Sequence, residues 1–263
     1  MAAPIRTHVD AARLTIMLSR PEVHNAFDEA MIEALDDAFR GIAGQDDVRY
    51  VVLAGEGASF CAGADVGWMR RMAGASPDAN RADARRLADM LESIATCPKP
   101  VIARVHGAAV GGGVGLVAAC DLAVAVPGAA FGLSEVRLGL APAVIFPLLL
   151  RKVARHEVLW AALTGERFPA ARAKDMGLVH EVAGDLDTAI DRWAQALLAG
   201  GPHALAAVKE LFNKVPQLSW ESAREMTVDL IARLRAGSEA REGMQAFFER
   251  RRPDWSLPGD AGR

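Results

Sequence analysis

An alternation of strand-like and helix-like patterns runs from the N-terminus to about Val182. Residues 5–9 and 14–18 are β-prone and flank a short polar turn, which predicts a β-hairpin. Fully apolar runs are typical of strands that are buried on both faces. Such runs predict strands at residues 50–54, 101–105, 121–126 and 178–182, with a short extended piece at 130–132.

Helical periodicity follows several of these strands. Met31, Leu35 and Phe39 recur at helical spacing behind Asp28, a suitable N-cap, and another helix is predicted behind Asn80. The glycine- and alanine-rich residues 55–68 are predicted as a loop, and further helices are predicted at 114–119, 147–153, 156–163, 170–176, 186–198, 202–212, 219–234 and 238–251. The pattern therefore predicts an α/β core of repeated ββα units over residues 1–200, followed by a helical oligomerisation region over residues 201–263.

The charge and cysteine content narrow the class of protein. Lysine and arginine number 30 and aspartate and glutamate 33, a net charge of −3, which is not typical of nucleic-acid or membrane-surface binding. The longest apolar runs, such as residues 141–150, are too short to span a bilayer, and residues 1–4 lack the features of a signal peptide. Three cysteines without CxxC spacing argue against a disulfide framework and a zinc site. We therefore expect a soluble, cytoplasmic protein that binds no metal.

A glycine-rich segment over residues 105–116 joins a predicted strand to a predicted helix. Glycines there let a ligand approach the main chain, and the start of the helix offers unsatisfied N–H groups and the positive end of its dipole. Such a place can hold an anion or a developing oxyanion. The alternative is a tight packing turn. Residues 59–65 form a second loop of small residues with exposed N–H groups.

Glu135 is the strongest candidate for proton transfer. It lies among Phe131, Leu133, Val136 and Leu138, and burial among apolar side chains raises the pKa of a carboxyl group toward the neutral range. The alternative is a surface glutamate paired with Arg137.

These segments together resemble the signature motifs of the enoyl-CoA hydratase/isomerase (crotonase) family. The motifs are residues 60–65, 107–115 and 131–140, and the resemblance continues from residues 21–27 to residues 242–250. It implies a crotonase-type spiral of ββα units with a C-terminal helical trimerisation region. It also implies homotrimers or hexamers built as dimers of trimers. Coenzyme A would be part of the acyl-CoA thioester substrate, and no separate cofactor is expected.

The resemblance also implies site residues. In the family, two backbone N–H groups hold the thioester oxygen; carried over, they belong to Ala62 and Gly112, and Glu135 is the catalytic carboxylate. Residues from both ends of the chain are implied in binding the CoA ester. They are Glu22, Val23, His24, Ala64, Asp65, Val66, Trp68 and Gly111, with Phe247 and Arg250 reaching the CoA of a neighbouring subunit.

The chain departs from the family's hydratases at Gly115, where those enzymes usually carry a second glutamate. One carboxylate can move a proton between two carbons, as in the family's isomerases, whereas adding water needs both a base and an acid. Hydration of a 2-enoyl-CoA, which we favour, and isomerisation by Glu135 alone both stay open. A non-catalytic CoA-ester-binding protein is a third possibility.

A finer resemblance favours hydration. Residues 61–73, 113–121 and 134–145 are similar to bacterial hydratases of branched glutaconyl-CoA thioesters. These thioesters include methylglutaconyl-CoA in leucine degradation and isohexenylglutaconyl-CoA in acyclic terpene degradation, and those hydratases also lack the helix glutamate. Their substrates carry a distal carboxylate that would need a cation in the pocket. The candidates are Arg70, Arg71 and Arg137, unless these side chains are solvated or paired with acidic neighbours.

Two other readings have less support. Residues 113–118 imitate a dinucleotide-binding fingerprint, but they lie in mid-chain without a following βαβ pattern. Cys61 has no histidine or aspartate partner nearby, which favours a packing residue over a nucleophile.

Overall fold

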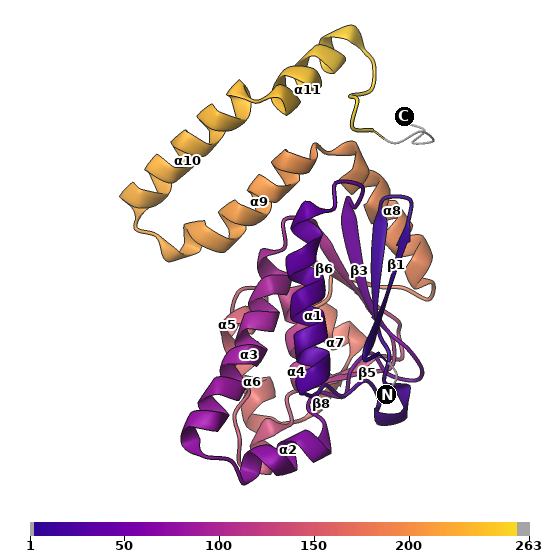
Figure 1. Cartoon of the computed structure of the whole chain (residues 1–263), viewed down its shortest axis with the longest axis vertical. Coiled ribbons are helices and arrows are strands. Elements are labelled where there is room, and N and C mark those ends of the chain that lie inside the picture. The colour runs from indigo at the N-terminus through magenta and orange to yellow at the C-terminus, as the bar shows by residue number, and fades with distance from the viewer. Residues whose placement is uncertain (1–2, 257–263) are drawn as a thin grey trace.

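A six-stranded sheet forms the centre of the protein in a computed structural model that describes residues 3–256 (Figure 1). The strand order is β1-β2-β3-β4-β6-β9. The bounds are β1 (Ile5–Asp10), β2 (Arg13–Leu18), β3 (Tyr50–Gly55), β4 (Val101–Val105), β6 (Leu122–Ala125) and β9 (Glu181–Val182). The predicted hairpin is confirmed, because β1 and β2 pair antiparallel, and all other neighbours in this sheet pair parallel.

A second sheet contains β5 (Ala108–Val110), β7 (Ala130–Gly132) and β8 (Arg167–Pro169), in that order. The chain leaves β4, turns at Gly107 and enters β5, and it passes in the same way from β6 to β7. From β4 to β7, successive strands therefore alternate between the two sheets, as the repeated units of the spiral require. The sequence predicted β7 but neither β5 nor β8; all three strands have only three residues and carry little periodic signal.

Helices cover both faces of the large sheet (Figure 1). Val51 and Leu53 of β3 belong to the core formed with α1 (Glu29–Gly41), α3 (Pro77–Thr96) and α4 (Gly112–Ala119). Tyr50 and Val52 point to the other face and pack with α8 (Leu186–Ala199). The apolar run of β3 is thus explained by burial on both faces.

The other helices surround this core. They are α2 (Val66–Ala73), α5 (Phe146–Leu149), α6 (Arg155–Thr164) and α7 (Ala170–Asp175), with 3₁₀ turns η1 (Pro21–Val23), η2 (Ile42–Gly44), η3 (Glu135–Leu138) and η4 (Val215–Gln217). Several predicted bounds were wrong. Ser76, not Asn80, caps α3, and α2 occupies part of the predicted loop. The helix predicted from residue 147 is a single turn, and the last strand keeps only two of its predicted residues.

Three C-terminal helices extend from the body as an arm (Figure 1). They are α9 (Pro202–Lys214), α10 (Trp220–Ala236) and α11 (Ser238–Glu249). Arg49 attaches the chain after α11 to the core, since its guanidinium donates to the carbonyls of Gly200 and Trp255, each at 2.8 Å. Among residues 3–256, no helix is long and apolar enough to cross a membrane.

Candidate active site

An apolar cavity of about 330 Å³ lies where the loop before α2, the helices α2 and α3, the N-terminus of α4 and the chain after β7 meet. Within the described residues, Asp83 and Glu135 are the only ionisable side chains that line it. A mostly apolar cavity with few polar groups is typical of a small-molecule site.

Glu135 begins η3 and is held against the N-terminus of α4. A Cβ atom on Gly111 would lie only 3.0 Å from Glu135 Oε1, and Gly111 has a φ of +54°, so glycine is required there for two reasons. Burial raises the pKa of the Glu135 carboxyl above its ordinary value. Its Oε2 is buried and has no hydrogen-bond partner among residues 3–256.

Glu135 is therefore not the surface glutamate of the alternative reading. No ion pair joins it to Arg137 or to any other cation in the described part of the chain. A half-buried carboxylate that faces a cavity, with one oxygen buried and unpaired among residues 3–256, is suited to accept and return a proton.

The loop at residues 62–64 runs past the N-terminus of α4. A Cβ atom on Gly63 would lie 3.5 Å from Gly112 N. The predicted role of Ala62 as a donor to substrate is wrong, because its N–H donates to the carbonyl of His24 (3.0 Å). Instead, the N–H groups of Ala64 and Gly112 have no acceptor within residues 3–256, and both residues line the cavity.

Phe27 contacts both segments that carry these two N–H groups. Its N–H donates to the carbonyl of Gly63 (2.8 Å), and its carbonyl accepts from Asp65 N–H (3.0 Å), which leaves the Ala64 N–H between them unused. The Phe27 ring packs so closely on Gly112 that any Cβ atom there would overlap with it. Alanine at position 112 would displace the ring.

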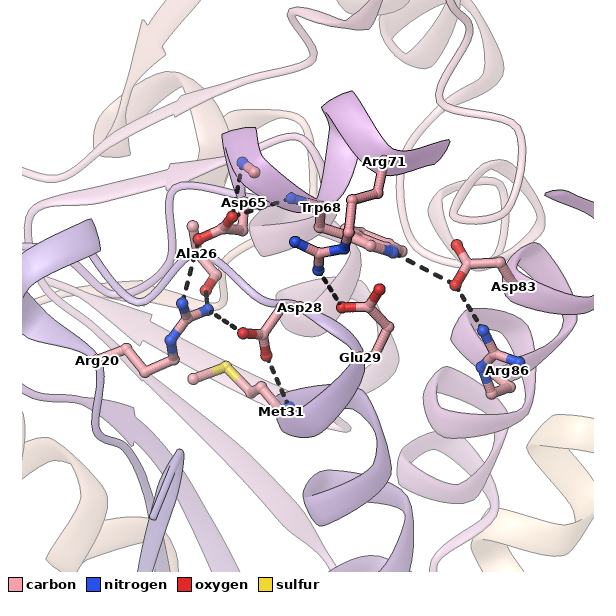
Figure 2. A network of polar contacts seen from close by, with 11 residues as sticks. Arg20, Ala26, Asp28, Glu29, Met31, Asp65, Trp68, Arg71, Asp83 and Arg86 are labelled. Atoms are coloured by element: carbon pink, nitrogen blue, oxygen red, sulfur yellow. Dashed lines mark hydrogen bonds and ion pairs between the residues drawn. The ribbon is translucent and has the colours of Figure 1, made fainter. Parts of the chain in front are cut away.

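A polar network positions the loop and α2 (Figure 2). Asp65 caps α2 by accepting from the N–H groups of Gly67 and Trp68, and it pairs with Arg20 at 3.1 Å. Arg20 also pairs with Asp28, the N-cap of α1, at 3.1 Å. Partial burial alone would raise the pKa of Asp65, but its N–H donors and Arg20 outweigh this effect and lower that pKa.

The segment Glu22–His24, predicted to bind the CoA ester, lies beside the same loop. His24 has a left-handed φ of +53°, which directs its carbonyl to Ala62 N–H, and its Nδ1 lies 3.1 Å from Ser59 Oγ. The side chain of Val66 is exposed at the start of α2. The structure thus brings the segments around residues 22–24 and 62–66 together next to the cavity.

Phe247 and Arg250 lie at the end of the arm, at the opposite end of the molecule from α2 (Figure 1). They cannot contact the cavity of their own chain. The Phe247 side chain is exposed.

None of the three arginines considered for a distal substrate carboxylate lines the cavity. Arg71 pairs with Glu29 at 2.6 Å (Figure 2), Arg70 is exposed, and the Arg137 side chain packs beside Gly165.

Cys61, next to the loop at residues 62–64, is buried and accepts a hydrogen bond from Gly63 N–H (3.4 Å). Burial raises the pKa of its thiol to about 12, as a packing role predicts.

Ile145 fills the space beside Gly115. A Cβ atom on Gly115 would overlap with the Ile145 side chain. We therefore expect Gly115→Glu to lower the free energy of unfolding by about 1–3 kcal/mol, the usual cost of overpacking. Urea unfolding measures this, and Ile145→Ala in the same chain should relieve part of the loss. Equal losses from Gly115→Glu in both backgrounds would show that Ile145 is not the obstacle.

Solved structures share this architecture. An enoyl-CoA hydratase of Shewanella pealeana superposes with a TM-score of 0.93 at 36% identity, covering 96% of each chain. One of Mycobacterium smegmatis superposes with a TM-score of 0.90 at 38% identity, covering 96% of this chain and 98% of that one. The predicted spiral is therefore confirmed, and the protein is an enzyme of the crotonase fold.

Sequence comparison identifies the family. The family described as "Enoyl-CoA hydratase/isomerase" matches residues 9–258, and the chain belongs to it. A probable enoyl-CoA hydratase of Rhodobacter capsulatus is 35% identical over 257 residues, 96% of this chain and 97% of that protein. A 1,2-epoxyphenylacetyl-CoA isomerase of Escherichia coli is 29% identical over 96% of this chain and 98% of its own length.

Proposed function

We propose that the protein adds water across, or removes it to form, the C2=C3 bond of a 2-enoyl-CoA thioester. The observation that carries this proposal is the placement of Glu135, a half-buried carboxylate whose Oε2 is buried and unpaired, near two backbone N–H groups that have no acceptor within residues 3–256. The thioester oxygen would accept from the N–H groups of Ala64 and Gly112, and the acyl chain would occupy the apolar cavity.

In the direction of hydration, Glu135 takes a proton from water while the water oxygen bonds to C3. The electron pair of the C2=C3 bond moves toward the thioester, and the negative charge develops on the thioester oxygen between the two N–H groups. Protonated Glu135 then gives the proton to C2 as the enolate collapses. The product has gained H and OH, and the carboxylate is restored, so one group serves as base and then as acid.

Isomerisation is the second candidate, because the description of the matching family includes isomerases and one carboxylate is sufficient for the reaction. There Glu135 would take a proton from C2 of a 3-enoyl-CoA and return it to C4. Incubation with matched 2-enoyl-CoA and 3-enoyl-CoA thioesters, followed by mass spectrometry, separates the reactions. A gain of one water supports hydration, and a shifted double bond at unchanged mass supports isomerisation. Tight binding of CoA esters without turnover of any would contradict both.

The chemical identity of the acyl group is a separate question from the reaction. The sequence resemblance favours a branched glutaconyl-CoA, and this assignment stays a prediction. The cavity supports a neutral acyl group better, because its ionisable side chains within the described residues are two carboxylates and no cation. The thioester panel should therefore include a glutaconyl-CoA.

We further propose that the enzyme acts as a homotrimer, or as a hexamer of two trimers, through the region over residues 201–263, of which 257–263 lie outside the described part. Large apolar side chains of the arm are exposed in the single chain: Trp220 by 80%, and Phe247 and Phe248 by 78% each. Burying such area drives association. Light scattering at micromolar concentration should give the mass of three or six chains. A monomer would contradict both the assembly and a role for Arg250 at a neighbour's CoA.

A further inference from the structure

Asp83 of α3 is a buried carboxylate that the proposed reaction does not use. Its side chain is only 8% exposed, and it lines the cavity together with Trp68 and Leu87. Both of its hydrogen bonds end on Oδ1, from Trp68 Nε1 at 3.3 Å and from Arg86 at 2.8 Å (Figure 2). Oδ2 has no hydrogen-bond partner among residues 3–256. A carboxylate in this setting presents one unused oxygen and its negative charge to whatever occupies this end of the cavity.

The charge of Asp83 is compensated from outside the cavity. Arg86 lies one turn further along α3, its side chain is 55% exposed, and it does not line the cavity. Nothing on the cavity side offers an opposite charge within the described residues, since Glu135 is the other ionisable lining group. An acyl chain that ended in a carboxylate would therefore be desolvated near two like charges.

We propose that Asp83 determines acyl specificity by excluding acyl groups that carry a carboxylate. The proposal rests on the proposed function, because it takes the cavity as the acyl site. The accepted substrates are 2-enoyl-CoA thioesters whose acyl chains are neutral, with a distal hydroxyl or amide able to donate to Asp83 Oδ2. A branched glutaconyl-CoA belongs to the excluded class.

The alternative role of Asp83 is purely structural, since it ties α3 to α2 through the Trp68 indole. Asp83→Asn distinguishes the two roles. Asparagine keeps a carbonyl oxygen in the place of Oδ1, where it can still accept from Trp68 and Arg86, but it removes the charge. Glu92→Gln is the matched control, because Glu92 lies on the same helix, is exposed and does not line the cavity.

The test measures kcat/KM for glutaconyl-CoA and for the acyl amide of the same length. The wild-type enzyme should prefer the amide by at least about 10-fold, the scale of a like-charge penalty of more than 1.4 kcal/mol. Asp83→Asn should reduce this preference by about 10-fold or more, and Glu92→Gln should leave it unchanged. An unchanged preference in Asp83→Asn, an equal loss of activity on both substrates, or a wild-type preference for glutaconyl-CoA would overturn the proposal.

Binding of the saturated analogues, glutaryl-CoA and its amide, measured by calorimetry, needs no turnover. If Asp83→Asn shifts the binding preference while no variant hydrates any thioester, the specificity role stands and the proposed reaction fails. If hydration occurs but neither preference shifts, the specificity role fails and the proposed reaction stands.

Discussion

Replacing Glu135 with glutamine should lower kcat for hydration by about 10²- to 10⁴-fold, the usual contribution of a positioned acid or base. Glutamine has nearly the same shape, so the packing of η3 against Gly111 and the binding of CoA esters should persist. Stopped assays with 2-butenoyl-CoA give the rate, and calorimetry with a saturated acyl-CoA gives the binding. Glu33→Gln on the exposed face of α1 is the control and should behave as the wild type. A Glu135→Gln enzyme that retains most of its activity would show that another group moves the proton.

The pH dependence of kcat/KM gives a second test of the role of Glu135. The base must be ionised to take a proton from water, and burial raises the pKa of Glu135 above the ordinary 4.5. On acidification, kcat/KM should therefore fall with an apparent pKa above 4.5, at a pH where an exposed glutamate would still be ionised. The residual activity of Glu135→Gln should lack this acidic limb. An acidic limb of the same midpoint in the glutamine variant would assign it to a different group.

The sequence predicted the strands and the longer helices of the core because their apolar residues recur regularly. Met31, Leu35 and Phe39 all lie in the core, as their helical spacing predicted. Elements with little periodic signal were missed: β5 and β8 have three residues each, and α2 exposes most of its residues. Aspartate is a common N-cap residue, so Asp65 is a local signal in the sequence that could have revealed the start of α2. Its side chain accepts hydrogen bonds from the N–H groups of Gly67 and Trp68 in the first turn of that helix.

The position of Glu135 at the cavity could be predicted, whereas the N–H group of Ala64 that stays without an acceptor among residues 3–256 could not. Glu135 is surrounded by apolar residues in the sequence itself, so burial followed from local composition. Which N–H group of the loop at 62–64 stays unused depends on residues distant in the chain. The carbonyl of His24 accepts from the N–H of Ala62. The two hydrogen bonds to Phe27 involve the residues on either side of Ala64, so the N–H of Ala64 has no acceptor within residues 3–256. The left-handed φ of His24 directs its carbonyl, and no sequence pattern gives that angle.

Ala64→Pro should lower kcat by about 10²- to 10³-fold, because proline has no N–H and removes one of the two proposed donors to the thioester oxygen. Position 64 suits this test better than position 112, where any Cβ atom would overlap with the Phe27 ring. Alanine already carries a Cβ atom, and the lost N–H donates to no acceptor within residues 3–256, so the fold loses no hydrogen bond there. Ala64→Ser, which keeps the N–H, is the matched control. Circular dichroism and the affinity for a saturated acyl-CoA establish that both variants fold. If folded Ala64→Pro hydrates 2-butenoyl-CoA as fast as Ala64→Ser, the developing charge is held elsewhere.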